Sequence, residues 1–322
     1  MLYSIRHITK FRYSAPISEN VMDVRMQPRT DDHQHNIDFY LYVQPTTNVF
    51  IYQDYLNNTI HHFSIPGLHK ELSLRAEAVV NVTAPELLPA ALTEADWAAV
   101  DGLSTSGEHW EMCTPSAFTQ LSPILQTLAE ELNVTRRADP LTVLRELNQA
   151  IYRTFTYSTK ATNVDSPIDE AIAQRRGVCQ DYAHVMLALV RNFLHMPCRY
   201  VSGYLYRQQS DQSISGATHA WVEVLLPKLG WVGFDPTNNL IAGERHIRAA
   251  IGRDYHEVPP TRGIFKGNAD SELSVSVYVR RTDDPAVQEE VPDTFPDTFM
   301  GPMRPAIVSY TSTLEMEQQQ QQ

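Results

Sequence analysis

Cysteine is scarce in this 322-residue chain, which contains only Cys113, Cys179 and Cys198. An odd and small number of cysteines argues against a fold held together by disulfides. No two of them form the C-x-x-C pair that is typical of many zinc sites. The thiols are therefore left free, and any one of them that is activated could serve as a nucleophile.

Long apolar runs are also missing. The longest one, Val185 to Val190, is far too short, because a membrane-spanning helix needs about 20 apolar residues. Residues 1–7 lack the charged-then-apolar pattern of an export signal. We therefore expect a cytoplasmic protein with no membrane partner, in a reducing compartment where a reactive thiol stays usable.

Positive charge is the third deficit. The chain has a net charge of −12, and no basic stripe of the kind that binds nucleic acid is present. Residues 282–322 alone carry eight acidic residues against Arg304, a net charge of −7, and they end in a run of glutamines. This composition predicts a disordered acidic tail and excludes nucleic acid as an expected partner.

What the sequence does contain is a nearly all-apolar segment directly after Cys179. Its apolar side chains fill almost every face of a helix: Tyr182, Ala183, Val185, Met186, Leu187, Leu189, Val190, Phe193 and Leu194. The pattern predicts a buried helix from about Cys179 to His195. Cys179 then lies in the first turn, where free backbone amides and the helix dipole favour an anion such as a thiolate. Because Asp181 opposes that charge, a nearby base is needed.

A predicted hairpin supplies this base. Residues 218–224 and 231–235 both alternate with period two, and Pro227 and Gly230 punctuate the segment between them. We expect Val224 opposite Gly230, which places Trp221 opposite Gly233. His219 then faces Asp235, and β-carbons roughly 4.5–5.5 Å apart permit an imidazole–carboxylate hydrogen bond. The sequence thus offers a nucleophile, a base and an orienting carboxylate.

Each of these residues has a simpler explanation when taken alone. A buried cysteine is more often a small core residue, a strand histidine is usually packed or solvated, and an aspartate before proline usually forms a turn. Zinc binding by Cys179, His184, His195, Cys198 and His219 is disfavoured, because the two helix histidines are far apart in sequence. We predict neither a metal nor another cofactor.

These stretches resemble the transglutaminase-like superfamily of papain-related cysteine enzymes, which also includes peptide N-glycanases. The similarity is greatest to the bacterial transglutaminase-like proteins with a dedicated N-terminal β region. It covers roughly residues 1–281 and is carried by residues 177–184 (GVCQDYAH), 199–205 (RYVSGYL), 219–223 (HAWVE) and 233–239 (GFDPTNN). It continues into residues 252–255 (GRDY) and 259–260 (PP). One departure is Tyr55-Leu56-Asn57-Asn58, where family members usually show an aromatic-Gly-Asn turn, so the local turn there is open.

The resemblance implies an α+β protein. Its papain/transglutaminase-like core packs a catalytic helix on an antiparallel sheet and is preceded by a small all-β domain. It also implies Cys179 as nucleophile, His219 as base and Asp235 as orienting acid. The Cys179 backbone amide supplies one oxyanion donor, and Gln180 or Tyr157 is a candidate for the second.

These residues predict a thiol-dependent amide-bond enzyme that forms an acyl-thioester with a peptide or protein substrate. We favour hydrolysis, as a cysteine peptidase or amidase, because nothing marks an amine-binding subsite. Protein-glutamine transglutamination is the first alternative, and a non-catalytic adaptor is the second. The sequence does not indicate an oligomeric state.

The periodic segments also predict the organisation of the chain. Residues 1–83 read as an N-terminal β-sandwich-like domain, with strands at 2–13, 37–43, 49–55, 59–65 and 71–82. Residues 84–115 read as a connector containing a short helix capped by Thr93. Residues 116–281 read as the catalytic domain, with helices at about 117–132 and 140–155 and a late strand at 273–279. Residues 282–322 form the tail.

Overall fold

The computed structural model describes residues 1–214 and 216–283, and the predicted tail lies outside them except for its first two residues. The N-terminal strands are all present and antiparallel. They are β1 (Leu2–Val24), β2 (Gln34–Gln44), β3 (Val49–Gln53), β4 (Thr59–Ile65) and β5 (His69–Val82). Burial alternates along much of β1 and β2, as the period-two pattern of the sequence predicts.

Strand β1 is much longer than the predicted strand 2–13 and connects two layers. Residues 2–12 pair with β5, whereas residues 20–24 pair with β4, so the strand order is β2-β5-β1-β4-β3. Apolar side chains from both layers, such as Phe11, Phe63 and Leu72, are buried between them. The all-β N-terminal region is therefore confirmed, as a sandwich that shares one bent strand.

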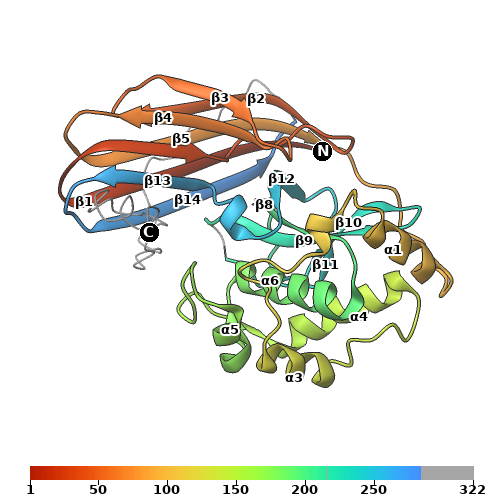
Figure 1. The fold of residues 1–322 in the computed structure, drawn as a ribbon. Helices are drawn as coiled ribbons and strands as arrows, with labels where there is room; N and C mark the ends of the chain where they lie inside the picture. Colours follow the sequence, from red (N-terminus) through yellow and green to blue (C-terminus); the bar gives the residue numbers. More distant parts are fainter. Residues whose placement is uncertain (215, 284–322) are drawn as a thin grey trace.

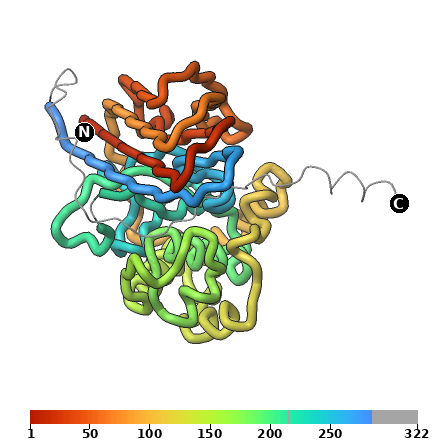
Figure 2. The backbone as a smooth tube through the Cα atoms, turned by 90° about the vertical axis from the view of Figure 1, so that its left-hand side faces the viewer, coloured from red at the N-terminus to blue at the C-terminus, as the bar shows by residue number. Residues whose placement is uncertain are grey.

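The end of the predicted catalytic domain belongs to this sandwich instead. Strands β13 (Thr261–Lys266) and β14 (Ser271–Arg281) both pair antiparallel with β1, and β14 runs from Tyr3↔Arg281 to Tyr13↔Ser271. Figure 2 shows β1 (red) and β14 (blue) side by side. The boundary 116–281 is thus corrected: residues 261–281 complete the N-terminal sheet. A strand pattern specifies that a strand forms but not which strand it pairs with.

The helices gather around α6 (Cys179–Leu189), which continues as a π-helical turn from Val190 to Leu194. The others are α1 (Asp96–Thr105), α2 (Trp110–Cys113), α3 (Pro123–Glu131), α4 (Pro140–Thr154) and α5 (Ile168–Gln174). Ser122 and Asp139 cap α3 and α4, and each is followed by a proline at the helix start. Thr93 donates its hydroxyl to Asp96 at the start of α1. The predicted connector is part of this core, since Trp97 and Val100 are buried in it.

A five-stranded antiparallel sheet lies between the helices and the sandwich (Figure 1). Its strand order is β11-β10-β9-β8-β12. The strands are β8 (Cys198–Leu205), β9 (His219–Leu226), β10 (Gly230–Asp235), β11 (Leu240–Ile241) and β12 (His246–Gly252). Alternate β9 residues (Ala220, Val222 and Val224) pack in the core with the helices. On the other face, Tyr204 and Ile247 pack against Tyr3 and Ile5 of the sandwich. A short parallel pair, β6 (Thr156–Tyr157) and β7 (Arg176–Gly177), and a 3₁₀ turn (Tyr255–Glu257) complete the fold.

Polar contacts also join the sandwich to the central sheet. Asn58 is buried and makes two hydrogen bonds of 2.8 Å with the backbone of Ile251 in β12. It lies in the turn where the sequence departs from the family pattern. Asn57 adopts φ = 59° there, a left-handed conformation that asparagine tolerates better than most residues. The departure therefore preserves the turn.

No helix within the described residues is long and apolar enough to cross a membrane.

Candidate active site

Cys179 is the first residue of α6 and is half-buried. The helix starts here because Val178 is extended and Asp181 folds back over it: the Asp181 carboxylate accepts a 2.7 Å hydrogen bond from the Val178 amide. A β-carbon on Gly177 would lie 2.5 Å from the same carboxylate, so only glycine fits beside it. The predicted placement of Cys179 at a buried helix start agrees with this geometry, and the dipole of a helix favours an anion at its first turn.

The negative charge of Asp181 disfavours a thiolate at Cys179. Burial raises its pKa to about 6, although hydrogen bonds from Thr162 and the Val178 amide partly offset this. The carboxyl is therefore mostly ionised at neutral pH and becomes neutral below about pH 6. The expectation that Asp181 opposes a thiolate at Cys179 thus depends on pH.

Strands β9 and β10 form the predicted hairpin, but its predicted register is wrong by two residues. Gly230 pairs with Leu226 and Val232 with Val224, so Asp235 comes opposite Trp221 rather than His219. The turn is tighter than predicted because Lys228 and Gly230 both adopt positive φ, at 67° and 70°. A lysine rarely adopts this conformation, and the sequence gives no signal for it.

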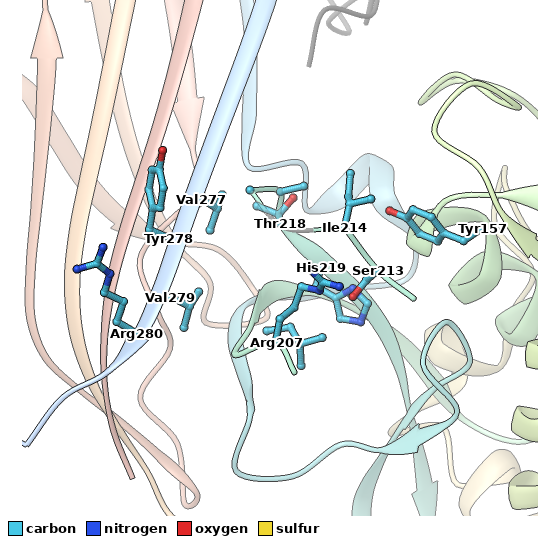
Figure 3. Close-up of a pocket in the computed structure, with 13 residues that line it drawn as sticks. Tyr157, Arg207, Ser213, Ile214, Thr218, His219, Val277, Tyr278, Val279 and Arg280 are labelled. Carbon is cyan, nitrogen blue, oxygen red and sulfur yellow. The ribbon is translucent and has the colours of Figure 1, made fainter. Parts of the chain in front are cut away.

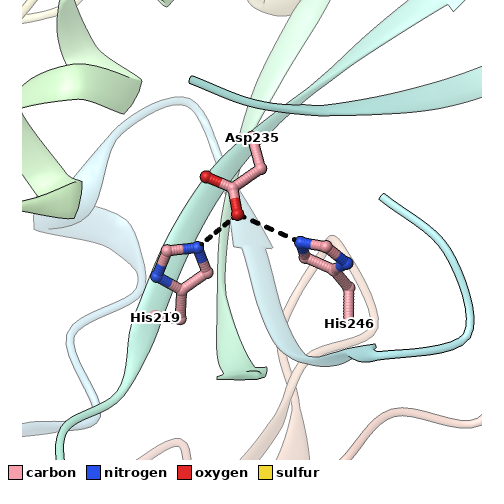
Figure 4. Close-up of side chains that lie close together, drawn as sticks. All are labelled: His219, Asp235 and His246. Atoms are coloured by element: carbon pink, nitrogen blue, oxygen red, sulfur yellow. Dashed lines mark hydrogen bonds and ion pairs between the residues drawn. The ribbon is translucent and has the colours of Figure 1, made fainter. Parts of the chain in front are cut away.

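His219 and Asp235 nevertheless meet. They are diagonal neighbours across the two strands, and His219 Nε2 lies 2.8 Å from Asp235 Oδ2. Diagonal pairs remain within reach of long side chains. Both residues are buried, and Figure 4 shows the imidazole directed at the carboxylate.

Asp235 is built to stay ionised. Its Oδ1 accepts hydrogen bonds from the backbone amides of Thr237 and Asn238, and its Oδ2 accepts from the Asn238 side chain at 2.9 Å. Burial by itself would raise its pKa, but His219 and His246 hold the pKa well below the ordinary value.

His219 correspondingly holds its proton. Burial lowers its pKa, but Asp235 and, to a smaller extent, Cys179 outweigh burial and raise the pKa to about 10. The ring uses Nε2 for Asp235, while Nδ1 is buried and has no hydrogen-bond partner among the described residues. The carboxylate thus orients one nitrogen of the ring, and the ring also interacts with Cys179.

Two residues that the sequence did not single out also contact Asp235. Asn238 donates to Oδ2, and His246 Nε2 lies 3.2 Å from the same oxygen. His246 begins β12, 11 residues after Asp235 in the sequence, and no local pattern marks it. A buried polar residue at a strand start is the only signal that could have indicated it.

The ligand atoms of His219, Asp235 and His246 lie within 4.8 Å of one another, a spacing that a metal ion can bridge. These atoms already take part in hydrogen bonds with one another. The Gly243 amide donates to His246 Nδ1, so Nε2 carries the ring proton and points at Asp235. With His219 also protonated toward Oδ2, N–H protons fill the positions that a cation would need.

The two predicted oxyanion donors lie in different surroundings. Tyr157 in β6 pairs with Gly177, next to the start of α6, and burial together with Cys179 raises its pKa. Gln180 instead uses its side-chain amide to hold Val164 O at 2.7 Å, which ties the loop after β6 to the helix. Two unpredicted tyrosines, Tyr200 and Tyr255, also interact with Cys179, and burial is the main cause of their raised pKa values.

Comparison with known proteins adds an independent line of evidence. Residues 126–236 match the model of the transglutaminase-like superfamily, and residues 3–81 match that of the bacterial transglutaminase-like N-terminal region. An uncharacterized protein of Mycobacterium tuberculosis is 30% identical over 305 residues, which is 86% of this chain and 92% of that protein. The chain belongs to the transglutaminase-like superfamily.

Two further relatives extend this assignment. A protein-glutamine gamma-glutamyltransferase of Pseudomonas aeruginosa is 32% identical over 134 residues, which is 38% of this chain and 19% of that enzyme. The crystal structure of a candidate cysteine protease from Cytophaga hutchinsonii superposes with a TM-score of 0.70, covering 88% of this chain and 92% of that one, at 20% identity. That likeness confirms the α+β fold. Members of the transglutaminase-like superfamily are generally cysteine enzymes.

A cavity of about 210 Å³ adjoins the transglutaminase-like core at His219. Tyr157, Thr218 and His219 line it on one side, and Val277 and Val279 of β14 line it on the other (Figure 3). A backbone hydrogen bond of 3.0 Å from Val277 to Gly216 holds the two sides together. The sandwich therefore supplies one wall of a cavity whose opposite wall carries the candidate base.

Proposed function

We propose that this protein is a cysteine hydrolase that cleaves amide bonds in a peptide or protein through an acyl-thioester. The observation that carries the proposal is the arrangement of His219, whose Nε2 is bound to Asp235 while Nδ1 has no hydrogen-bond partner among the described residues and the ring interacts with Cys179. A thiol with a base oriented by a carboxylate is the arrangement that activates a nucleophile.

The reaction follows from these roles. His219 Nδ1 holds the proton of the Cys179 thiol, so Cys179 reacts as a thiolate paired with the His219 imidazolium, and this thiolate adds to the amide carbonyl carbon. The tetrahedral intermediate collapses as the C–N bond breaks, and His219 gives its proton to the departing amine. Water then adds to the thioester while His219 takes a proton from it, and the acid is released as the C–S bond breaks.

Charge on the carbonyl oxygen must be stabilised while it develops. The Cys179 amide, at the start of α6, is one donor for this oxygen. Tyr157 is the better candidate for the second donor, because it interacts with Cys179 and lines the cavity beside His219. The Gln180 side chain is bound to Val164, which makes it the weaker candidate. Losing one such donor typically costs about 3 kcal/mol in the activation barrier.

The cavity beside His219 is a suitable place for one flank of the substrate. A volume of about 210 Å³ holds roughly seven water molecules, so one amino-acid side chain fits within it. Val277, Val279 and Leu205 provide apolar contacts there. We propose that a residue next to the cleaved bond occupies this cavity.

Transfer of the acyl group to an amine is the second candidate, favoured by the similarity to the Pseudomonas glutamyltransferase. A glutamine-containing peptide with a fluorescent primary amine separates the two reactions. Hydrolysis releases ammonia or a shorter peptide without labelling the peptide. Incorporation of the amine at a rate comparable to hydrolysis would favour transfer instead.

The primary test replaces the nucleophile. Cys179→Ala should abolish turnover of a peptide amide library and leave the melting temperature almost unchanged, because the side chain is small and half-buried. Cys113→Ala is the matched control: this thiol is also half-buried, and burial raises its pKa, so its loss should leave activity intact. Full activity in Cys179→Ala would end the proposal.

A second measurement addresses a non-catalytic binding role. Iodoacetamide at pH 6 should label Cys179 selectively in the intact protein, and labelling should fall at least tenfold in His219→Ala, because the imidazolium that stabilises the thiolate is gone. Equal labelling of the two proteins would favour an adaptor whose triad is inactive.

A further inference from the structure

His246 shares an acceptor with the candidate base. Its Nε2 lies 3.2 Å from Asp235 Oδ2, the same oxygen that His219 Nε2 reaches at 2.8 Å. Figure 4 shows the two imidazoles on either side of the carboxylate. They come from different strands, β9 and β12, which lie on either side of β8 in the sheet. The contact therefore exists only in the folded protein.

The protonation of His246 is set by its surroundings. The Gly243 amide donates a 3.3 Å hydrogen bond to Nδ1, which must therefore be an acceptor, and the proton resides on Nε2. The ring is 4% exposed and meets the edge of Trp221 at a centroid distance of 5.2 Å. Burial and the neighbouring cations His219 and Arg245 lower its pKa despite Asp235. His246 is thus a neutral, fixed hydrogen-bond donor.

We infer that His246 is a positioning residue that acts through Asp235 on the proton affinity of His219. The inference rests on the proposed function, in which His219 both accepts and returns a proton. His246 does not face the substrate in this scheme. Its N–H group withdraws negative charge from Asp235 Oδ2, and this weakens the pull of the carboxylate on the His219 proton.

The need for such a group follows from the strength of the His219–Asp235 pair. A base works best when its pKa is near the operating pH, and Asp235 already raises the pKa of His219 to about 10. Inside the protein, an isolated carboxylate beside His219 would hold the imidazolium proton too tightly for transfer to a departing amine. A second donor on the same oxygen reduces this effect and also keeps the carboxylate from turning away from His219.

The charged and titratable groups around His246 are few, which makes the effect measurable. Asp235 faces it from β10 and His219 from β9, while Arg245 precedes it in the chain and pairs with Asp211 at 2.9 Å. Arg245 keeps this partner in all variants considered below. A change in the titration of His219 on replacing His246 can therefore be traced to Asp235.

The test compares His246→Leu, which removes the donor but keeps an apolar side chain beside Trp221, with His246→Gln, which retains an N–H donor. Iodoacetate is the probe, because the Cys179 thiolate attacks its CH₂ carbon and displaces iodide, and the negative charge of the reagent favours this reaction while His219 is an imidazolium. This assay requires no substrate. The low-field proton resonance of His219 Nε2–H gives a second, spectroscopic readout.

In H246L we expect the basic limb of the iodoacetate profile to move up by about one pH unit, since fewer donors on Asp235 strengthen its hold on the His219 proton. The His219 resonance should move downfield, and amide hydrolysis should fall roughly tenfold, the usual effect of losing one hydrogen bond to a charged group. H246Q should match the wild type within about threefold in each readout.

Two results would overturn the inference. One is an H246L protein whose alkylation profile and His219 resonance equal those of the wild type. The other is equal loss in H246L and H246Q together with a lowered melting temperature, which would reduce His246 to a packing residue. Wild-type reactivity that is insensitive to His219→Ala would instead refute the proposed function, so the two failures are distinguishable.

Discussion

At the scale of single residues, Asp235 is the most heavily hydrogen-bonded group of the candidate site. Five N–H groups donate to its two oxygens: two backbone amides, the Asn238 side chain and the two imidazoles of His219 and His246. Such a carboxylate is ionised at all moderate pH values. Its role in the proposed chemistry is to fix the tautomer of His219 and to stabilise its charged form.

Replacing Asp235 by asparagine tests that role. The amide keeps the shape of the side chain but is neutral, and its nitrogen can face His219 Nε2, which favours the wrong tautomer. We expect kcat/KM for amide hydrolysis to fall roughly 10³- to 10⁴-fold. Steady-state kinetics and circular dichroism measure the two consequences. A loss below tenfold in a folded Asp235→Asn protein would contradict the assignment.

Asp181 offers a milder test at the same scale. Because burial raises its pKa to about 6, its charge is present at neutral pH and opposes a thiolate at Cys179. Asparagine can still accept the hydrogen bond from the Val178 amide. We therefore expect Asp181→Asn to be folded and to react with iodoacetamide roughly threefold faster at pH 7. Slower alkylation with an unchanged melting temperature would show that the charge does not act on the thiol.

At the scale of elements, β9 shows how the alternation of side chains along a strand gives its two faces different roles. Ala220, Val222 and Val224 pack against the helices, while the other face carries His219, Trp221 and Glu223. Glu223 is fully buried and is paired with Arg199 at 2.6 Å and with Arg248 at 2.6 Å. The strand thus anchors the sheet on one face and presents the candidate base at its first residue.

The absence of a side chain at Gly203 in β8 leaves space for the Trp221 ring and the Ile247 carbonyl. A β-carbon there would lie 2.2 Å from Ile247 O and 2.8 Å from the Trp221 ring. Gly203→Ala should therefore destabilise the protein by about 2–3 kcal/mol and displace the strand that carries His219. Urea unfolding measures this. In Gly102→Ala, where the added β-carbon meets open space in a helix, stability should be unchanged or slightly higher. Equal stability of the two variants would contradict the packing argument.

Prediction from sequence succeeded best for elements with a strong local signal. Strand β4 and helix α4 begin and end within one residue of expectation, because alternation and a capped apolar repeat are local properties. The predicted register of the β9–β10 hairpin was wrong by two residues, because a turn with Lys228 at positive φ has no sequence signature. The His219–Asp235 contact survived the error only because side chains reach diagonal neighbours.

At the scale of the whole molecule, both chain ends build the sandwich. Strand β14 lies against β1 along its first residues and also lines the cavity next to His219. The N-terminal region is therefore not an independent appendage, because residues from after the transglutaminase-like core complete its sheet. Through β14 the sandwich therefore contributes part of the lining of this cavity.

The buried histidines predict how stability depends on pH. Burial lowers the pKa of His7 and His184 to about 3 and that of His61 to about 4, whereas it raises that of Asp181 to about 6. These histidines stay neutral in the fold, so their contribution to stability is present above the unfolded value near 6.5 and is lost as the pH falls. Near pH 5, unfolding takes up about three protons at His7, His61 and His184 together and releases about one at Asp181.

For these four groups the net uptake on unfolding is about two protons. Near pH 5, the free energy of unfolding should therefore fall by roughly 3 kcal/mol for each unit by which the pH is lowered. Urea unfolding followed by circular dichroism at pH 7, 6 and 5 measures this slope. A protein that is as stable at pH 5 as at pH 7 would show that these histidines become protonated without unfolding.

The sequence by itself determined the N-terminal run of strands and the capped helix α4, that Cys179 begins a buried helix, and that His219 and Asp235 lie on adjoining strands. These properties follow from periodicity and capping, which act over a few residues. Tertiary structure alone decided the register of the hairpin, the pairing of β13 and β14 with β1, and the approach of His246 to Asp235. Each depends on which surfaces meet when the chain packs, and a repeat of hydrophobic residues specifies a face without specifying its partner.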